Sequence, residues 1–108
     1  MTAPFVTQLR TRGAALQLAR TGDPSITVRV EMPEVWNTVN VVVSPTQRVV
    51  EVKIAALKAL YPVESNHEDF VFKFRGWEVL DENETIDAAG ATGGSIFLLT
   101  HRRRRAVR

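Results

Sequence analysis

The side chains with the most conspicuous chemistry form a run of four arginines near the C-terminal end of the sequence. They are Arg102, Arg103, Arg104 and Arg105. Guanidinium groups bind carboxylates in bidentate pairs and attract phosphates by charge, and the phosphate contacts weaken as salt rises. Three interpretations stay open for this run: it binds an acidic groove on a protein, it contacts nucleic acid without reading sequence, or it is a solvated tail.

Charge is segregated along the chain. Residues 1–22 carry three arginines and no acid, whereas residues 23–101 hold all twelve acids and only six basic residues. The acidic middle would repel a polyanion, so any contact with nucleic acid is confined to the basic ends.

No other group of residues has the spacing of a catalytic or metal site. His67 and His101 stand alone, and the chain has no cysteine, which excludes a thiol nucleophile and a cysteine-based zinc site. The acidic run Asp81, Glu82 and Glu84 is expected to be a solvated loop, because general acid–base catalysis requires a pocket and shifted pKa values. We therefore expect no enzymatic activity, no metal or other cofactor, and no small-molecule substrate.

Targeting and membrane signals are not recognisable in the sequence. No stretch approaches the roughly 20 consecutive apolar residues that span a bilayer. The first 21 residues lack the basic start and apolar run of a secretory signal. We expect a cytoplasmic protein with no membrane span.

Five segments have the composition or the period-2 alternation of β-strands. They are residues 25–32, 38–43, 70–75, 77–80 and 95–100. A five-residue turn with its own proline separates the first two, which predicts a β-hairpin. The third segment places Phe70, Phe72 and Phe74 on one face, so Val71 and Lys73 point to the other.

The last strand and the two tryptophans complete the predicted sheet. We expect Ile96 and Leu98 to point toward the core, and Phe97 and Leu99 to point to solvent. Trp77 follows the turn glycine Gly76 and is expected to pack on its short strand.

One helix is expected between the hairpin and the third strand. Ser44 and Gln47 have the spacing of a capping box, and Pro45 suits the first helical position, so the helix is predicted to begin there and to end before Pro62. One helix among five strands predicts an α+β fold, in which a single mixed sheet has one helix packed across it.

The chain therefore divides into three predicted parts. Residues 1–24 form a basic N-terminal extension that is either flexible or an amphipathic helix. Residues 25–100 form the folded domain, and residues 101–108 form the arginine-rich tail.

The folded part resembles ubiquitin and the ubiquitin-like β-grasp proteins. The resemblance is carried by "NTVNVVVSPTQRVVEVKIAALKAL" and by "FVFKFRGWEVLDENETIDAAGATGGSIFLLT", and it covers about three quarters of the chain. The second stretch is similar to the family's order of apolar strand, glycine turn, leucine, acidic stretch, Thr-Ile and final apolar strand. The resemblance implies a ubiquitin-like β-grasp fold.

Members of this family that are conjugated end in Gly-Gly, because glycine fits the narrow channels of the activating enzymes. Here the sequence after Thr100 is "HRRRRAVR", and Gly93-Gly94 precedes the last strand, where we expect a turn. We therefore expect a non-conjugating type, with a modifier conjugated after processing as an alternative.

The family's other common role is docking through the solvent face of the sheet. The positions that match the family's apolar patch, together with their neighbours, predict a protein-binding site. Its residues are Trp36, Val71, Lys73, Phe97 and Leu99. Exposed apolar patches mark interfaces, and aromatic side chains beside arginine are common anchors. At this stage Phe97→Asp is expected to abolish partner binding without unfolding the domain.

The sequence as a whole predicts a non-enzymatic protein–protein interaction module, an adaptor or accessory subunit of a larger assembly. Proteins of bacterial type VII secretion-like systems are similar in lacking a Gly-Gly end, which makes such a system one candidate setting. A nucleic-acid-associated factor that binds through Arg102–Arg105 is the further alternative.

Overall fold

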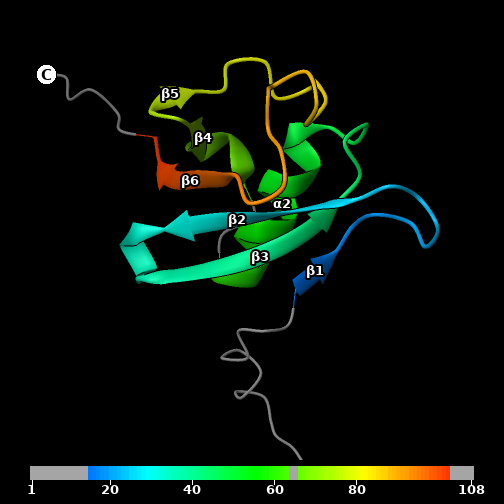
Figure 1. Cartoon of the computed structure of the whole chain (residues 1–108). Coiled ribbons are helices and arrows are strands. Elements are labelled where there is room, and N and C mark those ends of the chain that lie inside the picture. Colours follow the sequence, from blue (N-terminus) through cyan, green and yellow to red (C-terminus); the bar gives the residue numbers. More distant parts are fainter. Residues whose placement is uncertain (1–14, 64–65, 103–108) are drawn as a thin grey trace, which may run out of the picture.

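The computed structural model of the chain describes residues 15–63 and 66–102 (Figure 1). The strands are β1 (Ala15–Gln17), β2 (Ile26–Met32), β3 (Asn37–Val43), β4 (Phe70–Phe74), β5 (Trp77–Glu78) and β6 (Ile96–His101). The α-helix is α2 (Val49–Leu60), and the two short 3-10 helices are η1 (Pro33–Val35) and η2 (His67–Asp69). Among the described residues, no helix is long and apolar enough to cross a membrane.

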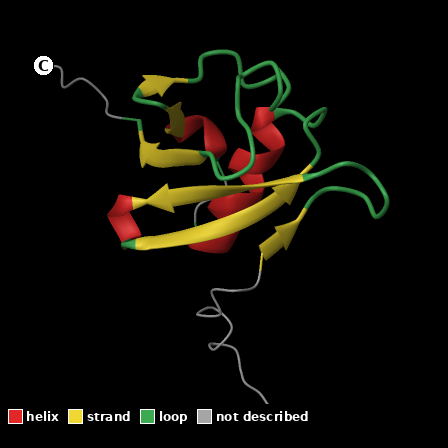
Figure 2. Cartoon of the chain, in the orientation of Figure 1, coloured by secondary structure: helices red, strands yellow, loops and turns green. Residues whose placement is uncertain are grey.

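These strands form one mixed sheet in the order β1-β3-β2-β6-β4-β5. β2 and β3 make the predicted antiparallel hairpin. β6 lies between β2 and β4, parallel to the first and antiparallel to the second. α2 packs across one face of the sheet, as Figures 1 and 2 show. The predicted α+β fold, one helix packed across a mixed sheet, is confirmed.

The helix-covered side, here called the inner face, holds the core. The alternation predicted for β2, β3 and β4 is correct, because every second residue of these strands lies on this face and most of these residues are buried. Its fully buried strand residues are Val28, Val30, Met32, Val41, Val43, Phe70, Phe72, Phe97 and Leu99. α2 contributes Val49, Val52, Ala56 and Leu57 to the same cluster.

The orientation predicted for β6 is wrong. Phe97 and Leu99 are fully buried, whereas Ile96 is 48% exposed. The register explains this, because Phe97 pairs with Phe74 and Leu99 pairs with Phe72, so both lie on the inner face of the sheet. Residues directly opposite each other in adjacent strands project to the same side. The outward-facing residues of β6 are therefore Ile96, Leu98 and Thr100.

The N-terminal edge of the sheet differs from the prediction. β1 runs parallel to β3, with Leu16 opposite Val41, so the predicted boundary between residues 24 and 25 falls after a strand of the sheet. Residues 1–14 and 103–108 lie outside the described residues, and with them most of the predicted N-terminal extension and Arg103–Arg105.

The helix begins later than the sequence pattern predicts. Ser44 and Gln47 do make the expected backbone-to-side-chain bond, from the Ser44 amide to Gln47 Oε1 at 2.9 Å. They close a turn, however, and α2 starts only at Val49. The amides of Val49 and Val50 donate to the carbonyls of Glu84 and Glu82 at 3.0 and 2.8 Å, so the loop after β5 caps this helix.

Candidate protein-interaction face

The side of the sheet opposite α2, here called the outer face, carries the candidate site. Its register places Glu31, Leu98, Lys73 and Glu78 in one row across β2, β6, β4 and β5. Arg29 and Ile96 form a neighbouring pair, and their backbones are opposite each other in β2 and β6. The outer face therefore has apolar side chains of β6 at its centre and charges of both signs on either side.

Two of the five predicted binding residues, Val71 and Lys73, lie on the outer face, and a third, Trp36, lies at the hairpin tip. The other two do not belong to this surface. Trp36 is 92% exposed at the tip of the hairpin, and Lys73 is partly exposed on the outer face. Val71 lies on the same face but is 7% exposed. Phe97 and Leu99 are buried on the inner face, so no partner can contact them while the domain is folded. Their assignment to a binding surface is withdrawn.

The hairpin tip is held against the C-terminal end of β6. The Trp36 amide donates to the Pro33 carbonyl at 3.0 Å, and Trp36 adopts a left-handed backbone with φ of 52°. Glu34 Oε2 accepts a hydrogen bond from the His101 amide at 2.8 Å. Because two bonds fix this tip, the exposed indole of Trp36 is presented on a defined backbone beside the last strand.

Arg102 shows what one member of the arginine run does. Its amide donates to the Asp69 carbonyl at 2.7 Å, and its Nε donates to the Glu68 carbonyl at 3.1 Å. Its Nη1 lies 3.4 Å from Glu78 Oε2. Arg102 is thus engaged within the domain, while Arg103, Arg104 and Arg105 lie outside the described residues.

Sequence reasoning missed Leu98 and Ile96 as outer-face residues and misjudged Trp77. Trp77 is 78% exposed, so the predicted packing on the short strand is wrong. The position of Trp77, opposite Phe74, belongs to the inner-face register but lies on the edge strand of the sheet. Arg29 and Glu31 mark the solvent side of β2, but only the pairing of β2 with β6 shows that Ile96 and Leu98 share that side.

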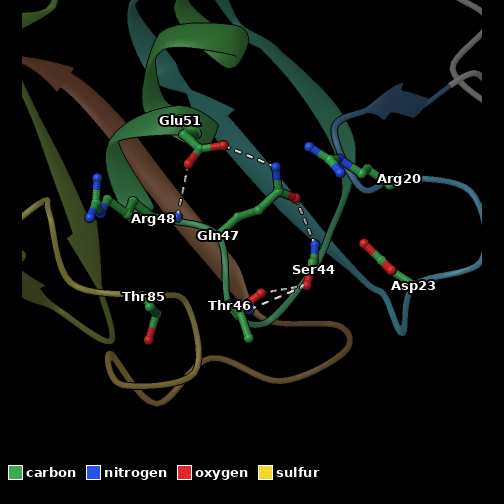
Figure 3. Close-up of a pocket in the computed structure, with 8 residues that line it drawn as sticks. All are labelled: Arg20, Asp23, Ser44, Thr46, Gln47, Arg48, Glu51 and Thr85. Carbon is green, nitrogen blue, oxygen red and sulfur yellow. Dashed lines mark hydrogen bonds between the residues drawn. The ribbon is translucent and has the colours of Figure 1, made fainter.

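A second feature is a polar pocket of about 430 Å³ where residues 20–23 meet the start of α2 (Figure 3). Arg20 and Arg48 lie on opposite sides of Gln47 in this view. Gln47 Nε2 donates to Glu51 Oε1 at 2.9 Å and to the Leu18 carbonyl at 3.1 Å. Carboxylates of Asp23 and Glu51 line the same pocket, so its charges are balanced. Its hydrogen bonds fasten the segment after β1 to the turn before the helix.

The acidic loop contains a buried ion pair. Lys53 of α2 is 1% exposed, and its Nζ donates to both oxygens of Glu82, at 3.0 and 2.8 Å. The expectation that Glu82 is simply solvated is therefore wrong. His67 Nδ1 lies 3.9 Å from Glu82 Oε1. Because a buried charge is costly without a partner, Glu82 compensates the buried Lys53 in the folded domain.

Gly93-Gly94 forms the predicted turn before β6. The Gly94 amide donates to the Thr27 carbonyl at 2.8 Å, and Gly94 has φ of 87°, which favours glycine. This pair therefore lies within the folded domain, in an exposed turn just before β6, the strand that contributes Phe97 to the core.

Comparison with known proteins identifies the fold. No protein-family model and no curated protein sequence matches the chain. Among solved structures, the ubiquitin-like domain of an Arabidopsis thaliana protein matches with a TM-score of 0.60 and 21% identity, over 83% of this chain and 92% of that one. Caldiarchaeum subterraneum ubiquitin matches with a TM-score of 0.63 and 15% identity, over 77% of this chain and 100% of that one. A designed protein based on ubiquitin matches with a TM-score of 0.61 and 22% identity, over 81% and 100%. The chain has the ubiquitin-like β-grasp fold.

Proposed function

We propose that this ubiquitin-like domain is a non-enzymatic protein–protein interaction module, an adaptor or accessory subunit of a larger assembly, that binds its partner through the hairpin tip and the outer face. The observation that carries the proposal is the exposed indole of Trp36, held on a fixed backbone beside the last strand. Tryptophan is enriched among the residues that dominate binding energies. A fixed backbone lowers the entropic cost of ordering its side chain on binding.

The outer face supports the same role through its mixed character. Leu98 lies between Glu31 and Lys73, and Ile96 lies beside Arg29. An apolar centre with charges around it is the anatomy of a transient protein interface. The partner is therefore expected to present an apolar side chain to Leu98 and opposite charges to Lys73 and Arg29.

The first experiment is a pull-down of the tagged chain from its native cells, with and without nuclease, read by mass spectrometry. A defined protein captured in stoichiometric yield, with the bait at its own mass, supports the module. Loss of every partner on nuclease treatment would instead assign binding to the arginine run and nucleic acid. A bait that shifts to the mass of a covalent adduct would point to a conjugated modifier. A type VII secretion-like system is one candidate for the larger assembly that this module would serve. The identity of the captured protein tests that setting.

A matched pair of tryptophan variants then locates the surface. Trp36→Ala is expected to weaken binding of the captured partner at least about 30-fold, because a central anchor contributes about 2 kcal/mol or more. Trp77→Ala removes an indole that is also mostly exposed but lies away from the outer-face register, so its affinity should stay within about threefold. The reverse result would move the interface to the β5 edge and refute the outer-face assignment.

A further inference from the structure

A stack of planar groups runs from the core to the surface at the turn between β4 and β5. The rings of Phe72 and Phe97 have centroids 4.8 Å apart, and the ring of Phe74 follows with its centroid 4.9 Å from that of Phe97. The guanidinium carbon of Arg75 lies 5.0 Å from the centroid of the Phe74 ring. Because Arg75 is exposed, the stack ends at the surface in a flat, positively charged group.

The backbone at this turn is unusual for an arginine. Arg75 has φ of 58° and the next residue, Gly76, has φ of 85°. Turns with two such residues favour Asn, Asp or Gly at the first position, because a longer side chain is disfavoured in the left-handed region. Residues held in sparsely populated backbone regions cluster at functional sites, so Arg75 is a candidate binding residue.

The Arg75 guanidinium has no carboxylate partner within the part of the chain that the structure describes. The ion pairs formed there join other residues. Residues 73–77, "KFRGW", contain two basic residues and no acid. The turn is therefore locally basic within the acidic middle of the chain, and its guanidinium is available to an anion.

Trp77 adds a second flat group beside the first. Its side chain is 78% exposed on β5, the last strand at this edge of the sheet. Trp77 lies directly opposite Phe74 in the register, so the indole projects to the same side of the sheet as the ring that Arg75 covers. An exposed indole and a stacked guanidinium thus share one side of the turn.

The arginine run begins near the same edge. Arg102 Nη1 lies 3.4 Å from the Oε2 atom of Glu78, the neighbour of Trp77, and this contact partly neutralises the carboxylate of β5. Figure 1 shows β5 and the end of β6 on the same side of the domain. Arg103, Arg104 and Arg105 follow directly in the sequence, so further cations are attached beside β5.

We propose that the β4–β5 turn binds single-stranded nucleic acid through Arg75 and Trp77, while the arginine run contacts the phosphates. Bases of single strands stack on aromatic rings and on guanidinium planes, and cations along the backbone add affinity that falls with salt. The exposed indole favours this ligand over an acidic peptide, whose carboxylates would leave it uncovered. The site uses neither Trp36 nor Leu98, so it is separate from the proposed protein-interaction face.

The test measures fluorescence anisotropy of a fluorescein-labelled oligothymidylate of about 12 nucleotides, a length within the range that small single-strand-binding domains cover. The comparison probes are the same strand paired with oligoadenylate and an oligoglutamate peptide of equal charge. The variants of the full chain are Trp77→Ala and Arg75→Asn, and Trp36→Ala is the matched control because it removes the other exposed indole. Asparagine tolerates the left-handed backbone, so Arg75→Asn should not lower the melting temperature.

Both Trp77→Ala and Arg75→Asn are expected to weaken binding of the single strand about tenfold, because each removes a group on which a base stacks. Trp77→Ala should leave duplex binding within about twofold, since paired bases are stacked within the duplex and only its phosphates are contacted. Trp36→Ala should leave binding of every probe within about twofold. The triple variant Arg103→Ser, Arg104→Ser, Arg105→Ser should weaken single strand and duplex alike and reduce the salt dependence.

Three outcomes would overturn the proposal. The first is no binding of the single strand at about 50 mM salt, where phosphate contacts are strong. The second is binding that the triple arginine variant abolishes but Trp77→Ala leaves unchanged, which would assign all affinity to the tail. The third is oligoglutamate binding that depends on Trp77 as strongly as the oligothymidylate does, which would make the ligand an acidic protein segment.

A fluorescence measurement decides if Trp77→Ala fails to fold. In a Trp36→Phe chain, Trp77 is the remaining indole, and its emission should be quenched when oligothymidylate stacks on it. Unchanged emission at saturating oligothymidylate refutes the site. Loss of the captured protein partner in Trp36→Ala concerns a different surface, so failure of this site and failure of the proposed interaction module are distinguishable.

Discussion

The last strand, β6, contributes side chains to both faces of the sheet. Those on the inner face belong to the core, and those on the outer face belong to the surface. On the inner face, the Phe97 ring stacks between those of Phe72 and Phe74, with centroids 4.8 and 4.9 Å apart and interplanar angles of 12° and 23°. On the outer face, adjacent Leu98 lies between Glu31 and Lys73. The comparison teaches that the pairing register, rather than the apolar character of a residue, decides whether β6 supplies the core or a surface.

The largest effect is expected where the inner face is broken. Phe97→Ala removes the ring at the centre of the stack and should lower the free energy of unfolding by about 3–5 kcal/mol. For a domain of this size, that loss corresponds to a fall in melting temperature of at least about 12 °C. Thermal and urea unfolding followed by circular dichroism measure both quantities.

Phe97→Asp should be worse still, because the carboxylate would be buried without a partner. This reverses the earlier expectation that Phe97→Asp abolishes binding in a folded domain. Phe97→Leu keeps most of the apolar volume and is the control, with an expected loss of about 1 kcal/mol. A Phe97→Ala variant that melts within about 2 °C of the unaltered chain would show that Phe97 is not in the core.

An intermediate effect is expected at the buried ion pair beneath the acidic loop. Glu82→Ala leaves the Lys53 ammonium 1% exposed without its carboxylate partner, so the domain should lose about 3 kcal/mol of stability. Lys53→Met with Glu82→Ala removes both charges and keeps the apolar length of the lysine. The double variant should recover most of the loss, because the desolvation cost disappears with the charges.

Urea unfolding of the unaltered chain, Glu82→Ala, Lys53→Met and the double variant completes a double-mutant cycle. A coupling energy near zero between Lys53 and Glu82 would mean that the pair is solvated, and the structural assignment of Glu82 would be wrong. Glu84→Ala serves as the control, since its side chain takes no part in this ion pair and only its backbone carbonyl caps α2.

The sequence predicts the fold well where a physical pattern is local. The alternation in residues 25–32 and 38–43, and the three phenylalanines of residues 70–75, specify their inner faces correctly. In "IFLLT" no polar residue marks the solvent side until Thr100, so two phases are equally compatible with the pattern, and only pairing with β4 selects one. The same pairing could not be read from the sequence, because it joins residues far apart in the chain.

The candidate site was less predictable than the fold for related reasons. Trp36 was identified because a hairpin turn exposes its central residues, which is a local rule. The role of Arg102 was not predictable, because its bonds to Glu68 and Glu78 join three separate segments. β1 was missed because three residues have little strand signal of their own, and its stability comes from the edge of β3.

The smallest effect is expected one residue away from the largest. Ile96→Thr keeps a β-branched side chain on the outer face, where Ile96 is 48% exposed, so the free energy of unfolding should change by no more than about 0.5 kcal/mol. The same urea measurement used for Phe97→Ala makes the two neighbours directly comparable. A loss above about 1.5 kcal/mol would indicate that another part of the chain covers the outer face. If Ile96→Thr instead loses little stability but binds the captured partner more weakly, the interface extends from Trp36 across β6. A side chain that contributes little to folding is free to contribute to binding.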